Sequence, residues 1–302
     1  MVALIIPVLN GGVVFEDCLA AIGGQTLRFN TKLVLDSGSS DGSRDLALKH
    51  GFEVWDVPHG TFNHGGTRSL AASKVKDDIL LFLTQDAVLN EPEAAAKLVA
   101  AFEASNIAAA FGRQLPHHDA DDIATHARLR SYGTDSYVTS ITSSYPAGIR
   151  KCFLSNSFAA YRREALQGIG GFPSNVILAE DMFVAARLLQ AGWSVAYVAE
   201  ARARHSHNYT IREEFRRYFD TGVFQKQQAW ILEEFGRPEG EGVRVALDQV
   251  RYLWRQNRWG QIPRSLAVSS VKYFGYKLGL RHDRLGQDVS RRLAMHKRYF
   301  AE

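Results

Sequence analysis

Short apolar runs that alternate with helix-like segments constrain the fold of this 302-residue chain more than any other feature. The strand-like runs are residues 3–10, 32–36, 52–58 and 78–84, with helix-like segments at 13–26, at 43–51 and in the later half of 61–75. Such alternation is typical of parallel strands in a sheet that helices cover on both faces. We therefore expect an α/β protein with a mainly parallel sheet flanked by helices.

Carboxylates stand where several of these apolar runs end. Asp36 ends KLVLD, Asp86 follows DILLFLT, and the pair Glu180-Asp181 opens an amphipathic run. In open α/β sheets, ligands bind beyond the carboxyl ends of the strands. Three acidic positions without an obvious nucleophile predict a protein that binds a charged ligand through a metal ion and removes a proton.

The rest of the chain suggests a main domain and an extension. A helix is expected at 91–105, whereas residues 116–152 are polar and irregular and predict a mobile or substrate-facing segment. From Thr210 onward the sequence looks helical and is rich in aromatic residues and arginine. We expect a main domain over residues 1–210 and a helical extension over residues 211–302.

Cysteine usage and the absence of long apolar runs indicate a protein of a reducing compartment. Cys18 and Cys152 lie far apart and lack metal-ligand spacing, so no disulfide framework is expected. The opening ALIIPVLN lacks the basic segment of a signal peptide, and no run reaches ~18 apolar residues. These features predict a cytoplasmic protein.

The net charge of +4 conceals a basic C-terminal segment. Residues 243–302 contain 13 Lys and Arg against 4 Asp and Glu, whereas the preceding 242 residues contain 23 against 28. This segment predicts contact with an anionic partner, such as the cytoplasmic face of the inner membrane or a phosphorylated acceptor; no nucleic-acid partner is expected. The aromatic residues of this segment suit a membrane interface. The alternative is that they pack against the main domain or against another copy of the chain.

Several motifs resemble one known family in both order and spacing. PVLN, LVLDSGSSDGS, TQDA, and GGF followed by AED look like glycosyltransferase family 2, whose GT-A fold is Rossmann-like. The resemblance covers roughly residues 3–210, which would then form the catalytic domain. TFNHGGTR (61–68) and HSHNYT (205–210) look like the bacterial rhamnosyltransferase branch.

The resemblance implies a nucleotide-sugar site at the ends of the first strands. Small residues after Asp36 let backbone N–H groups approach a ligand, and its carboxylate can accept hydrogen bonds from a base or ribose. Arg68 stands beside glycines at a helix start and suits phosphate oxygens, and the alternative is an arginine on the surface of the helix. For Asp41, the alternative to ligand binding is a helix cap. The predicted donor-binding residues are Pro7, Val8, Asn10, Asp36, Ser37, Ser39, Asp41, Asn63, Gly65, Arg68, Gln85 and Asp86.

A divalent metal ion is the cofactor that the resemblance implies. Related proteins carry Asp-x-Asp where this chain has Thr84-Gln85-Asp86, so metal binding here rests on Asp86. Oxygen ligands and phosphates suit Mg²⁺ or Mn²⁺. The family places a metal-ligating histidine after a later strand; His205 falls at that spacing, and His207 is the alternative.

For catalysis, the resemblance assigns Asp181 as the base that deprotonates the acceptor hydroxyl. A carboxylate can act as a base if burial and an acidic neighbour, Glu180, raise its pKa; an N-terminal helix cap is the alternative. Gly171, Phe172 and Trp193 are expected to shape the acceptor pocket, with core packing as the alternative for the two aromatic residues.

The implied function is that of an inverting hexosyltransferase in cell-surface polysaccharide or lipopolysaccharide synthesis. The donor would be dTDP-L-rhamnose and the acceptor a saccharide, free or polyprenyl-linked; homo-oligomer formation is left open. A UDP- or GDP-sugar donor, a non-catalytic nucleotide- or glycan-binding protein and a sugar nucleotidyltransferase are the alternatives. The last would carry a basic glycine-rich loop after its first strand, and ALIIPVLNGGVVFEDC contains no Lys or Arg.

Overall fold

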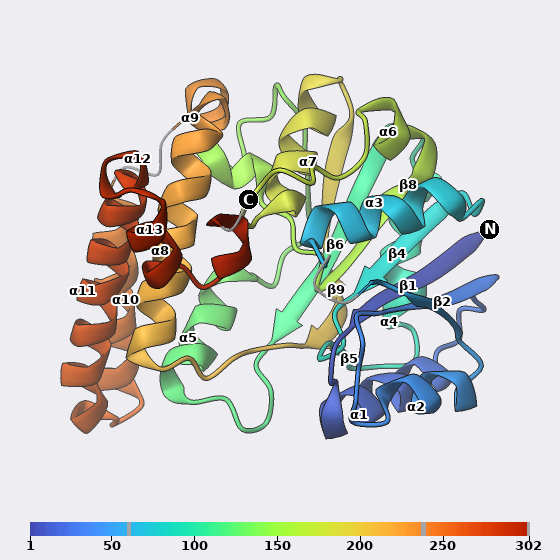
Figure 1. The fold of residues 1–302 in the computed structure, drawn as a ribbon, viewed down its shortest axis with the longest axis horizontal. Helices are drawn as coiled ribbons and strands as arrows, with labels where there is room; N and C mark the ends of the chain where they lie inside the picture. Colours follow the sequence, from blue (N-terminus) through green and yellow to red (C-terminus); the bar gives the residue numbers. More distant parts are fainter. Residues whose placement is uncertain (59–61, 237–239, 301–302) are drawn as a thin grey trace.

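A twisted sheet forms the centre of the computed structural model, which describes residues 1–58, 62–236 and 240–300 (Figure 1). Its strands are β1 (Val2–Val8), β2 (Thr31–Asp36), β3 (Glu53–Asp56), β4 (Ile79–Leu83), β5 (Val88–Leu89), β6 (Ile107–Leu115), β7 (Tyr137–Thr139), β8 (Phe158–Arg162) and β9 (Ser194–Arg204). They lie in the order β3-β2-β1-β4-β8-β6-β9-β5, and β7 also pairs with β9.

The sheet is mainly parallel, as the alternation of the sequence predicted. β1 pairs in parallel with β2 and β4, β2 with β3, and β6 with β9. The strand β8 lies between β4 and β6 and runs antiparallel to both, as do the short strands β5 and β7 relative to β9. The sequence did not predict β8, because FAAYR is short and lacks the β-branched residues that favour strands.

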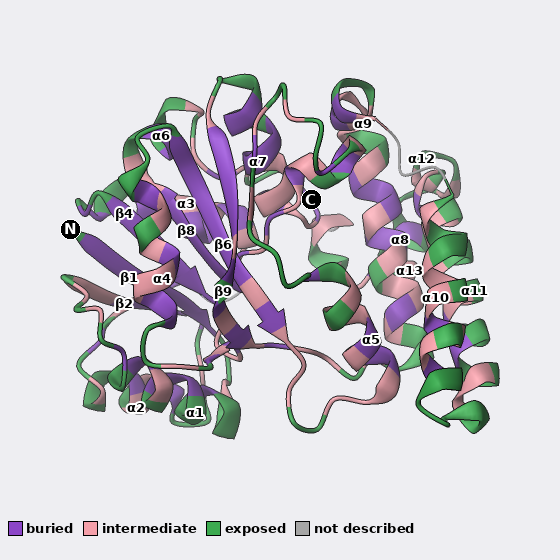
Figure 2. Ribbon diagram, turned by 180° about the vertical axis from the view of Figure 1, so that it is seen from behind, coloured by how far each residue is buried: buried purple, intermediate pink, exposed green. Residues whose placement is uncertain are grey.

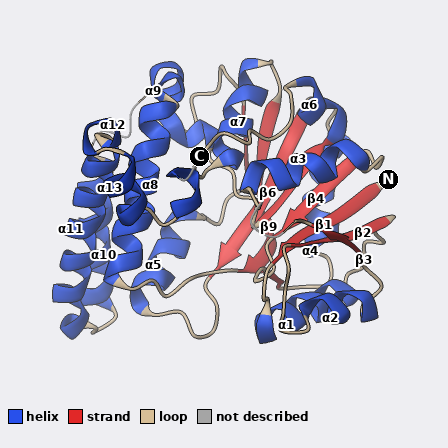
Figure 3. Cartoon of the chain, viewed as in Figure 1, coloured by secondary structure: helices blue, strands red, loops and turns tan. Residues whose placement is uncertain are grey.

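Helices cover both faces of the sheet and also form a separate layer beside it (Figure 3). They are α1 (Gly12–Gly23), α2 (Ser43–Lys49), α3 (His64–Lys74), α4 (Ala94–Ala100), α5 (Asp122–Ser131), α6 (Arg163–Gly168), α7 (Glu180–Gln190), α8 (Ile211–Gln227), α9 (Ala229–Phe235), α10 (Glu241–Arg255), α11 (Ile262–Gly279), α12 (His282–Leu285) and α13 (Gln287–Leu293). Short 3₁₀ helices cover Ala101–Glu103, Gly148–Cys152, Trp259–Gln261 and Lys297–Phe300.

Two hydrophobic cores lie on opposite faces of the sheet because successive strand side chains point to opposite sides. In β1, Ala3 and Ile5 belong to one core, and Leu4 and Ile6 belong to the other. The first core includes residues of α3, α6, α7 and α8, and the second includes residues of α1, α2 and α4. The strands are therefore buried on both faces (Figure 2), which explains their nearly continuous apolar sequences.

Two expectations for the middle of the chain need correction. Residues 116–152 are not simply irregular, since they contain α5, β7 and a 3₁₀ helix. Asp121 caps α5 by accepting a hydrogen bond from the Ala124 N–H at 2.8 Å, but the helix buries only Ile123, Ala124 and His126 and lacks an apolar stripe. The helix expected at 91–105 is shorter, because α4 passes into the 3₁₀ helix after Ala100.

The C-terminal part of the chain is helical, as predicted, and packs tightly on the rest. Phe219 and Val223 of α8 belong to the same core as the sheet. Glycines let α8 and α11 approach closely: a Cβ at Gly279 would lie 2.0 Å from the Phe219 carbonyl oxygen, and one at Gly275 would lie 2.4 Å from the Phe215 carbonyl oxygen. The division into residues 1–210 and 211–302 stays a prediction. Among the described residues, no helix is long and apolar enough to cross a membrane.

Candidate active site

A cavity of about 830 Å³ lies between the carboxyl ends of the central strands and the C-terminal helices. Pro7 and Val8 line it from the end of β1, Asp86 from the segment after β4, and Asp181 from the start of α7. The opposite wall comes from α5, α8 and α11. Its volume is within the range of ligand-binding pockets, and it contains the predicted metal ligands and the predicted base.

Asp86, His205 and His207 form a compact cluster at one end of this cavity. The Asp86 Oδ2 lies 3.5 Å from His205 Nε2 and 3.6 Å from His207 Nε2. One ligand atom from each residue lies within 4.8 Å of the other two. One carboxylate and two imidazoles are a donor set that suits a divalent ion such as Mn²⁺. The two histidines that the sequence offered as alternatives therefore occur together.

The buried side chain of Gln114 fixes the orientation of His205. Gln114 Oε1 lies 2.9 Å from His205 Nδ1 and also accepts a hydrogen bond from Arg128 at 2.6 Å. The Gln114 amide donates to Ser155 Oγ at 2.8 Å, which identifies the oxygen as the atom facing the imidazole. His205 must therefore donate its Nδ1–H, so Nε2, which lies 3.5 Å from Ser157 Oγ and 3.5 Å from Asp86 Oδ2, carries the lone pair. This is the tautomer that a metal ligand requires.

The charges of the cluster also match those of metal ligands. Burial lowers the pKa of His205 and lowers that of His207 to about 4, so both rings are neutral near pH 7. Burial opposes ionisation of Asp86, but the two neighbouring histidines hold its pKa below its ordinary value. An anionic carboxylate and two neutral imidazoles can therefore bind a cation without first losing a proton.

Asp181 has the environment that a general base needs. Its carboxylate accepts hydrogen bonds from the Asn156 N–H at 3.1 Å and from the Met182 N–H at 2.8 Å. Burial and the negative charge of Glu180 nevertheless raise its pKa to about 7. A base whose pKa is near the working pH combines a useful ionised fraction with sufficient proton affinity.

Glu180 is buried in an ion pair with Arg68, which was predicted to bind phosphate. The Arg68 Nη1 lies 3.1 Å from Glu180 Oε1 and donates to the His64 carbonyl oxygen at 2.9 Å. Asn156 Nδ2 also donates to Glu180 Oε1, at 2.9 Å. Burial opposes ionisation of Glu180, but Arg68, together with His64 and the hydrogen bond from Asn156, holds the pKa of Glu180 below its ordinary value. Arg68 lines the cavity, yet its Nη1 already has two partners.

The helix that carries Asp181 begins with an unusual backbone conformation. Ala179, directly before Glu180, has φ +58°, in the left-handed region that non-glycine residues rarely adopt. Such a conformation costs on the order of 1 kcal/mol and is typical of functional sites. The turn at Ala179 brings both carboxylates to the cavity wall.

Several predicted donor-binding residues lie together at the ends of β1 and β2 without lining the cavity. The Asp36 carboxylate accepts hydrogen bonds from the Ser39 N–H, and Asn10 Oδ1 accepts one from the Ser40 N–H at 2.8 Å. Asp41 accepts from the N–H and hydroxyl of Ser43, the first residue of α2, whose N-cap residue is Gly42. Asp36, Ser37, Ser39, Asp41 and Asn10 are not among the lining residues.

Three other predicted donor-binding residues hold loops in place. Gln85 lines the cavity, but its side-chain amide exchanges two hydrogen bonds with the backbone of Leu9, at 2.8 and 3.2 Å. Asn63 caps α3 through the Gly66 N–H and donates to the Ser174 carbonyl. A Cβ at Gly65 would lie 1.8 Å from the Pro173 carbonyl oxygen, so this position needs glycine for close packing; Thr61 of the same motif lies outside the described residues.

The residues predicted to shape the acceptor pocket lie away from the cavity. Phe172 is 4 % exposed and packs edge-to-face on Phe82 and Tyr161, with ring centroids 5.4 and 5.2 Å apart. Gly171, Phe172 and Trp193 are all missing from the lining residues. The core-packing alternative therefore describes Phe172 and Trp193 better, because GGF begins a turn that covers the sheet.

Two polar residues that organise the site from within were not predicted from the sequence. Asn156 bonds to both Glu180 and Asp181, and Gln114 orients His205, but a single buried amide has no motif. The outer wall includes Tyr209, Tyr218, Arg217, Lys272 and His296, from α8, α11 and the segments that flank them. The only available signal was the unusual density of aromatic and basic residues after Thr210.

Comparison with known proteins identifies the family of the chain. The sequence model of glycosyl transferase family 2 matches residues 3–170, and that of glycosyl transferase family 21 matches residues 141–220. The chain is 46% identical to the O-antigen chain rhamnosyltransferase RfbN of Salmonella typhimurium, over 99% of this chain and 96% of RfbN. It is 44% identical to the O-antigen chain rhamnosyltransferase WbaN of Salmonella anatum, over 98% and 95% of the two chains.

Solved structures share the fold at low sequence identity. The mannosyltransferase PcManGT from Pyrobaculum calidifontis, in complex with GDP-Man and Mn²⁺, has a TM-score of 0.59 at 15% identity and covers 99% of this chain and 84% of its own. S. aureus TarS 1–349 in complex with UDP-GlcNAc has a TM-score of 0.57 at 14% identity, with 94% and 92% covered. The predicted GT-A fold is confirmed. Because the family match covers more than half of the chain and both rhamnosyltransferases cover nearly all of it, the chain belongs to glycosyl transferase family 2.

Proposed function

We propose that this glycosyltransferase transfers L-rhamnose from dTDP-L-rhamnose to a hydroxyl group of a saccharide during synthesis of a cell-surface polysaccharide. The observation that carries the proposal is one cavity that contains both a metal-ligand cluster around Asp86 and a base, Asp181, whose pKa is near neutrality. The choice of sugar is supported by 46% identity over nearly the whole chain to an O-antigen chain rhamnosyltransferase.

The residues of the cluster fit a divalent cation. Asp86, His205 and His207 would hold it, and Gln114 keeps His205 in the tautomer that ligates. When bound, the ion neutralises charge that develops on the departing nucleoside diphosphate. Mn²⁺ or Mg²⁺ is the ion that we infer. The mannosyltransferase of the same fold was solved with Mn²⁺ and GDP-Man, which supports this inference.

Asp181, which lines the same cavity, would accept the proton of the attacking hydroxyl. The acceptor oxygen would displace the nucleoside diphosphate in a single step, with inversion at the anomeric carbon. Asn156 and the Met182 N–H hold the carboxylate in place through hydrogen bonds to both oxygens. The ion pair with Arg68 stabilises the ionised form of Glu180. The negative charge of Glu180 in turn raises the pKa of Asp181.

The acceptor that fits this proposal is a growing saccharide on a polyprenyl carrier. Such a carrier lies in the inner membrane, so the reaction would take place at its cytoplasmic face. Tyr209 and Tyr218 line the outer part of the cavity and offer aromatic faces on which sugar rings can pack.

A donor panel tests the proposal directly. Purified protein would be mixed with dTDP-L-rhamnose, UDP-sugars and GDP-sugars, with Mn²⁺ or with EDTA, and release of the nucleoside diphosphate would be followed. We expect consumption of dTDP-L-rhamnose only with metal, and loss of turnover but not of donor binding in Asp181→Asn. Consumption of a UDP- or GDP-sugar instead would refute the donor assignment, and turnover that ignores EDTA would refute the metal site.

A further inference from the structure

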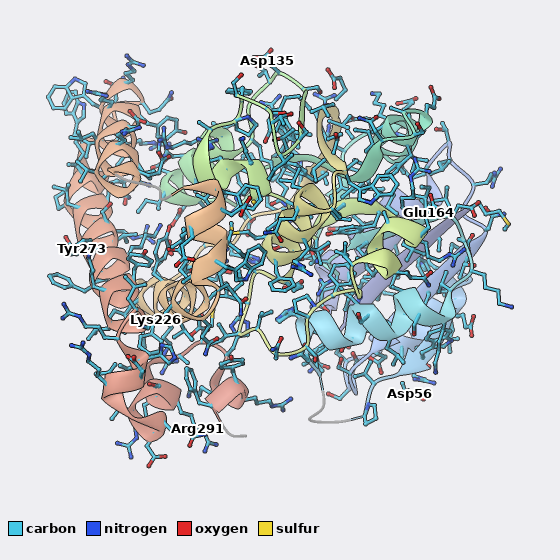
Figure 4. All side chains as sticks on the ribbon, turned by 90° about the horizontal axis from the view of Figure 1, so that it is seen from above. Asp56, Asp135, Glu164, Lys226, Tyr273 and Arg291 are labelled. Carbon is cyan, nitrogen blue, oxygen red and sulfur yellow. The ribbon has the colours of Figure 1, made fainter. Side chains whose placement is uncertain are left out.

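The outer face of the α10–α11 hairpin carries exposed apolar side chains next to arginines. The exposed fractions are 67% for Val243, 51% for Leu247 and 63% for Trp254 on α10, 57% for Trp259 in the 3₁₀ helix that follows, and 50% for Leu266, 58% for Tyr273 and 60% for Phe274 on α11. Figure 4 shows Tyr273 pointing outward from α11, away from the body of the protein. Large side chains of this kind are usually covered when they gather on one surface.

Helical spacing sorts these residues into stripes. Val243, Leu247 and Trp254 are four and seven residues apart, so they lie on one side of α10. Arg244, Arg251 and Arg255 repeat at seven and four residues and form a basic stripe beside the apolar one. The ring centroids of Trp254 and Trp259 are 5.6 Å apart, which extends the apolar stripe around the end of the hairpin.

The other side of the hairpin is already used for packing. Gln249 of α10 accepts a hydrogen bond from Ser265 of α11 at 2.8 Å, and both residues are buried. Arg130 of α5 forms ion pairs with Glu241, at 3.0 Å, and with Asp248. The exposed stripes therefore belong to a hairpin whose position in the fold is fixed, and Figure 2 shows its outer surface as mostly exposed.

We infer that this surface docks the protein on an anionic membrane. It consists of Val243, Leu247, Trp254, Trp259, Leu266, Tyr273 and Phe274 with Arg244, Arg251 and Arg255. Charge complementarity identifies the occupant, because residues 243–302 carry 13 Lys and Arg against 4 Asp and Glu. A second copy packed on this face would take the arginines of both copies out of water, which is costly unless they find partners. Aromatic rings beside cations are favoured where lipid headgroups meet the acyl chains.

Docking through this surface would place the cavity beside the membrane. α11 contributes Leu266, Tyr273 and Phe274 to the outer face, and Arg264 and Lys272 to the cavity wall. A helix is about 10 Å in diameter, so the cavity would lie roughly one helix width from the lipid headgroups. This step rests on the proposed function, since a polyprenyl-linked saccharide would then reach Asp181 from the membrane side; the docking surface itself does not depend on it.

Cosedimentation with vesicles tests the docking surface without measuring catalysis. The full chain would be mixed with vesicles of phosphatidylcholine alone or of phosphatidylcholine with phosphatidylglycerol, at low and at high salt. We expect binding only to the anionic vesicles and release at high salt. No binding to anionic vesicles, or equal binding to both vesicle types, would overturn the inference.

Matched variants then locate the surface. The triple variant Trp254→Ser, Trp259→Ser, Phe274→Ser and the double variant Arg251→Ser, Arg255→Ser should each bind at least about tenfold more weakly. Leu48→Ser removes an equally exposed apolar side chain, 50% exposed on α2, and should bind normally. Normal binding by the triple variant would overturn the inference.

Two further readouts separate this inference from its rivals. All variants should unfold at the temperature of the unmodified chain and keep their turnover of dTDP-L-rhamnose with a water-soluble acceptor. A wild-type dimer that the triple variant converts to a monomer in light scattering would assign the surface to a second copy instead. Vesicle binding without rhamnosyl transfer would refute the proposed function and leave the docking surface in place.

Discussion

The pH dependence of turnover tests the role of Asp181 most directly. Burial and the charge of Glu180 raise the pKa of Asp181 to about 7, and only the ionised carboxylate can accept a proton. With that pKa, about half of the protein is active at pH 7 and about 3% at pH 5.5. We expect kcat/KM to fall about tenfold for each pH unit below 7 and to level off above pH 8.

His207 should not produce this fall in activity, because burial and neighbouring charges lower its pKa to about 4. Burial also lowers the pKa of His205, and weaker Mn²⁺ binding at pH 5.5 than at pH 8 is the alternative cause that a control must test. A Mn²⁺ titration at both pH values would verify that the metal site is intact across the range.

Two variants distinguish Asp181 from other titrating groups. Asp181→Asn should lower kcat by about 10²–10⁴-fold. Glu180→Gln removes the negative charge that raises the pKa of Asp181, so the fall in activity should move to lower pH. Rates would be measured with dTDP-L-rhamnose at saturating Mn²⁺. A flat profile in the unmodified protein, or near-normal kcat in Asp181→Asn, would refute the assignment of the base.

The same shift predicts how stability depends on pH. The folded-state pKa of Asp181 lies above its unfolded value, so its contribution to stability is fully present below about pH 4 and is lost as the pH rises through 7. Asp181→Asn should therefore unfold at a higher temperature than the unmodified chain at pH 8, and at nearly the same temperature at pH 4. A gain that is equal at both pH values would contradict this explanation.

Three further changes test the metal site and the helix packing. His205→Ala should abolish measurable Mn²⁺ binding in calorimetry, and binding at the original affinity would remove His205 from the ligand set. Gln114→Leu should weaken Mn²⁺ binding by about 10–100-fold while the protein remains folded, because His205 loses the acceptor that fixes its tautomer; unchanged affinity would contradict that role. Gly279→Ala should lower the free energy of unfolding in urea by about 3 kcal/mol or more, because its Cβ would lie 2.0 Å from the Phe219 carbonyl oxygen. Gly242→Ala is the control: it has open space around it and should cost less than about 1 kcal/mol. Equal losses in the two variants would contradict the close contact between the helices.

The sequence predicted the layers of the fold better than the details of the site. Apolar runs such as β1 are buried on both faces, so burial alone specifies their composition, and their order predicts parallel pairing. The short strand β8 and helix α5 were missed because tertiary contacts, rather than an apolar pattern of their own, hold them. The three acidic positions came from the sequence, since the carboxyl ends of strands face ligands.

What the sequence could not predict was which polar groups already have partners. Gln85 and Asn63 are polar residues in the expected places, yet their side chains bond to the backbones of Leu9 and Ser174. The distinction depends on contacts 76 and 111 residues away along the chain, which no local pattern encodes. Phe172 shows the same limit, because its neighbours in the core come from distant strands.

The ion pair between Arg68 and Glu180 explains why two adjacent carboxylates at one helix start behave differently. Glu180 is buried and Asp181 is half-buried, so both carboxylates are costly to ionise. Arg68 and Asn156 bond to Glu180, which therefore carries the charge, whereas Asp181 has only backbone donors and the repulsion of its neighbour. Arg68 thus acts on Asp181 in two opposite ways: it keeps Glu180 ionised, which raises the pKa of Asp181, and its own positive charge lowers that pKa. In this interpretation the arginine tunes the base through Nη1, whereas its buried Nε has no hydrogen-bond partner among the described residues, so its predicted contact with the diphosphate stays a prediction.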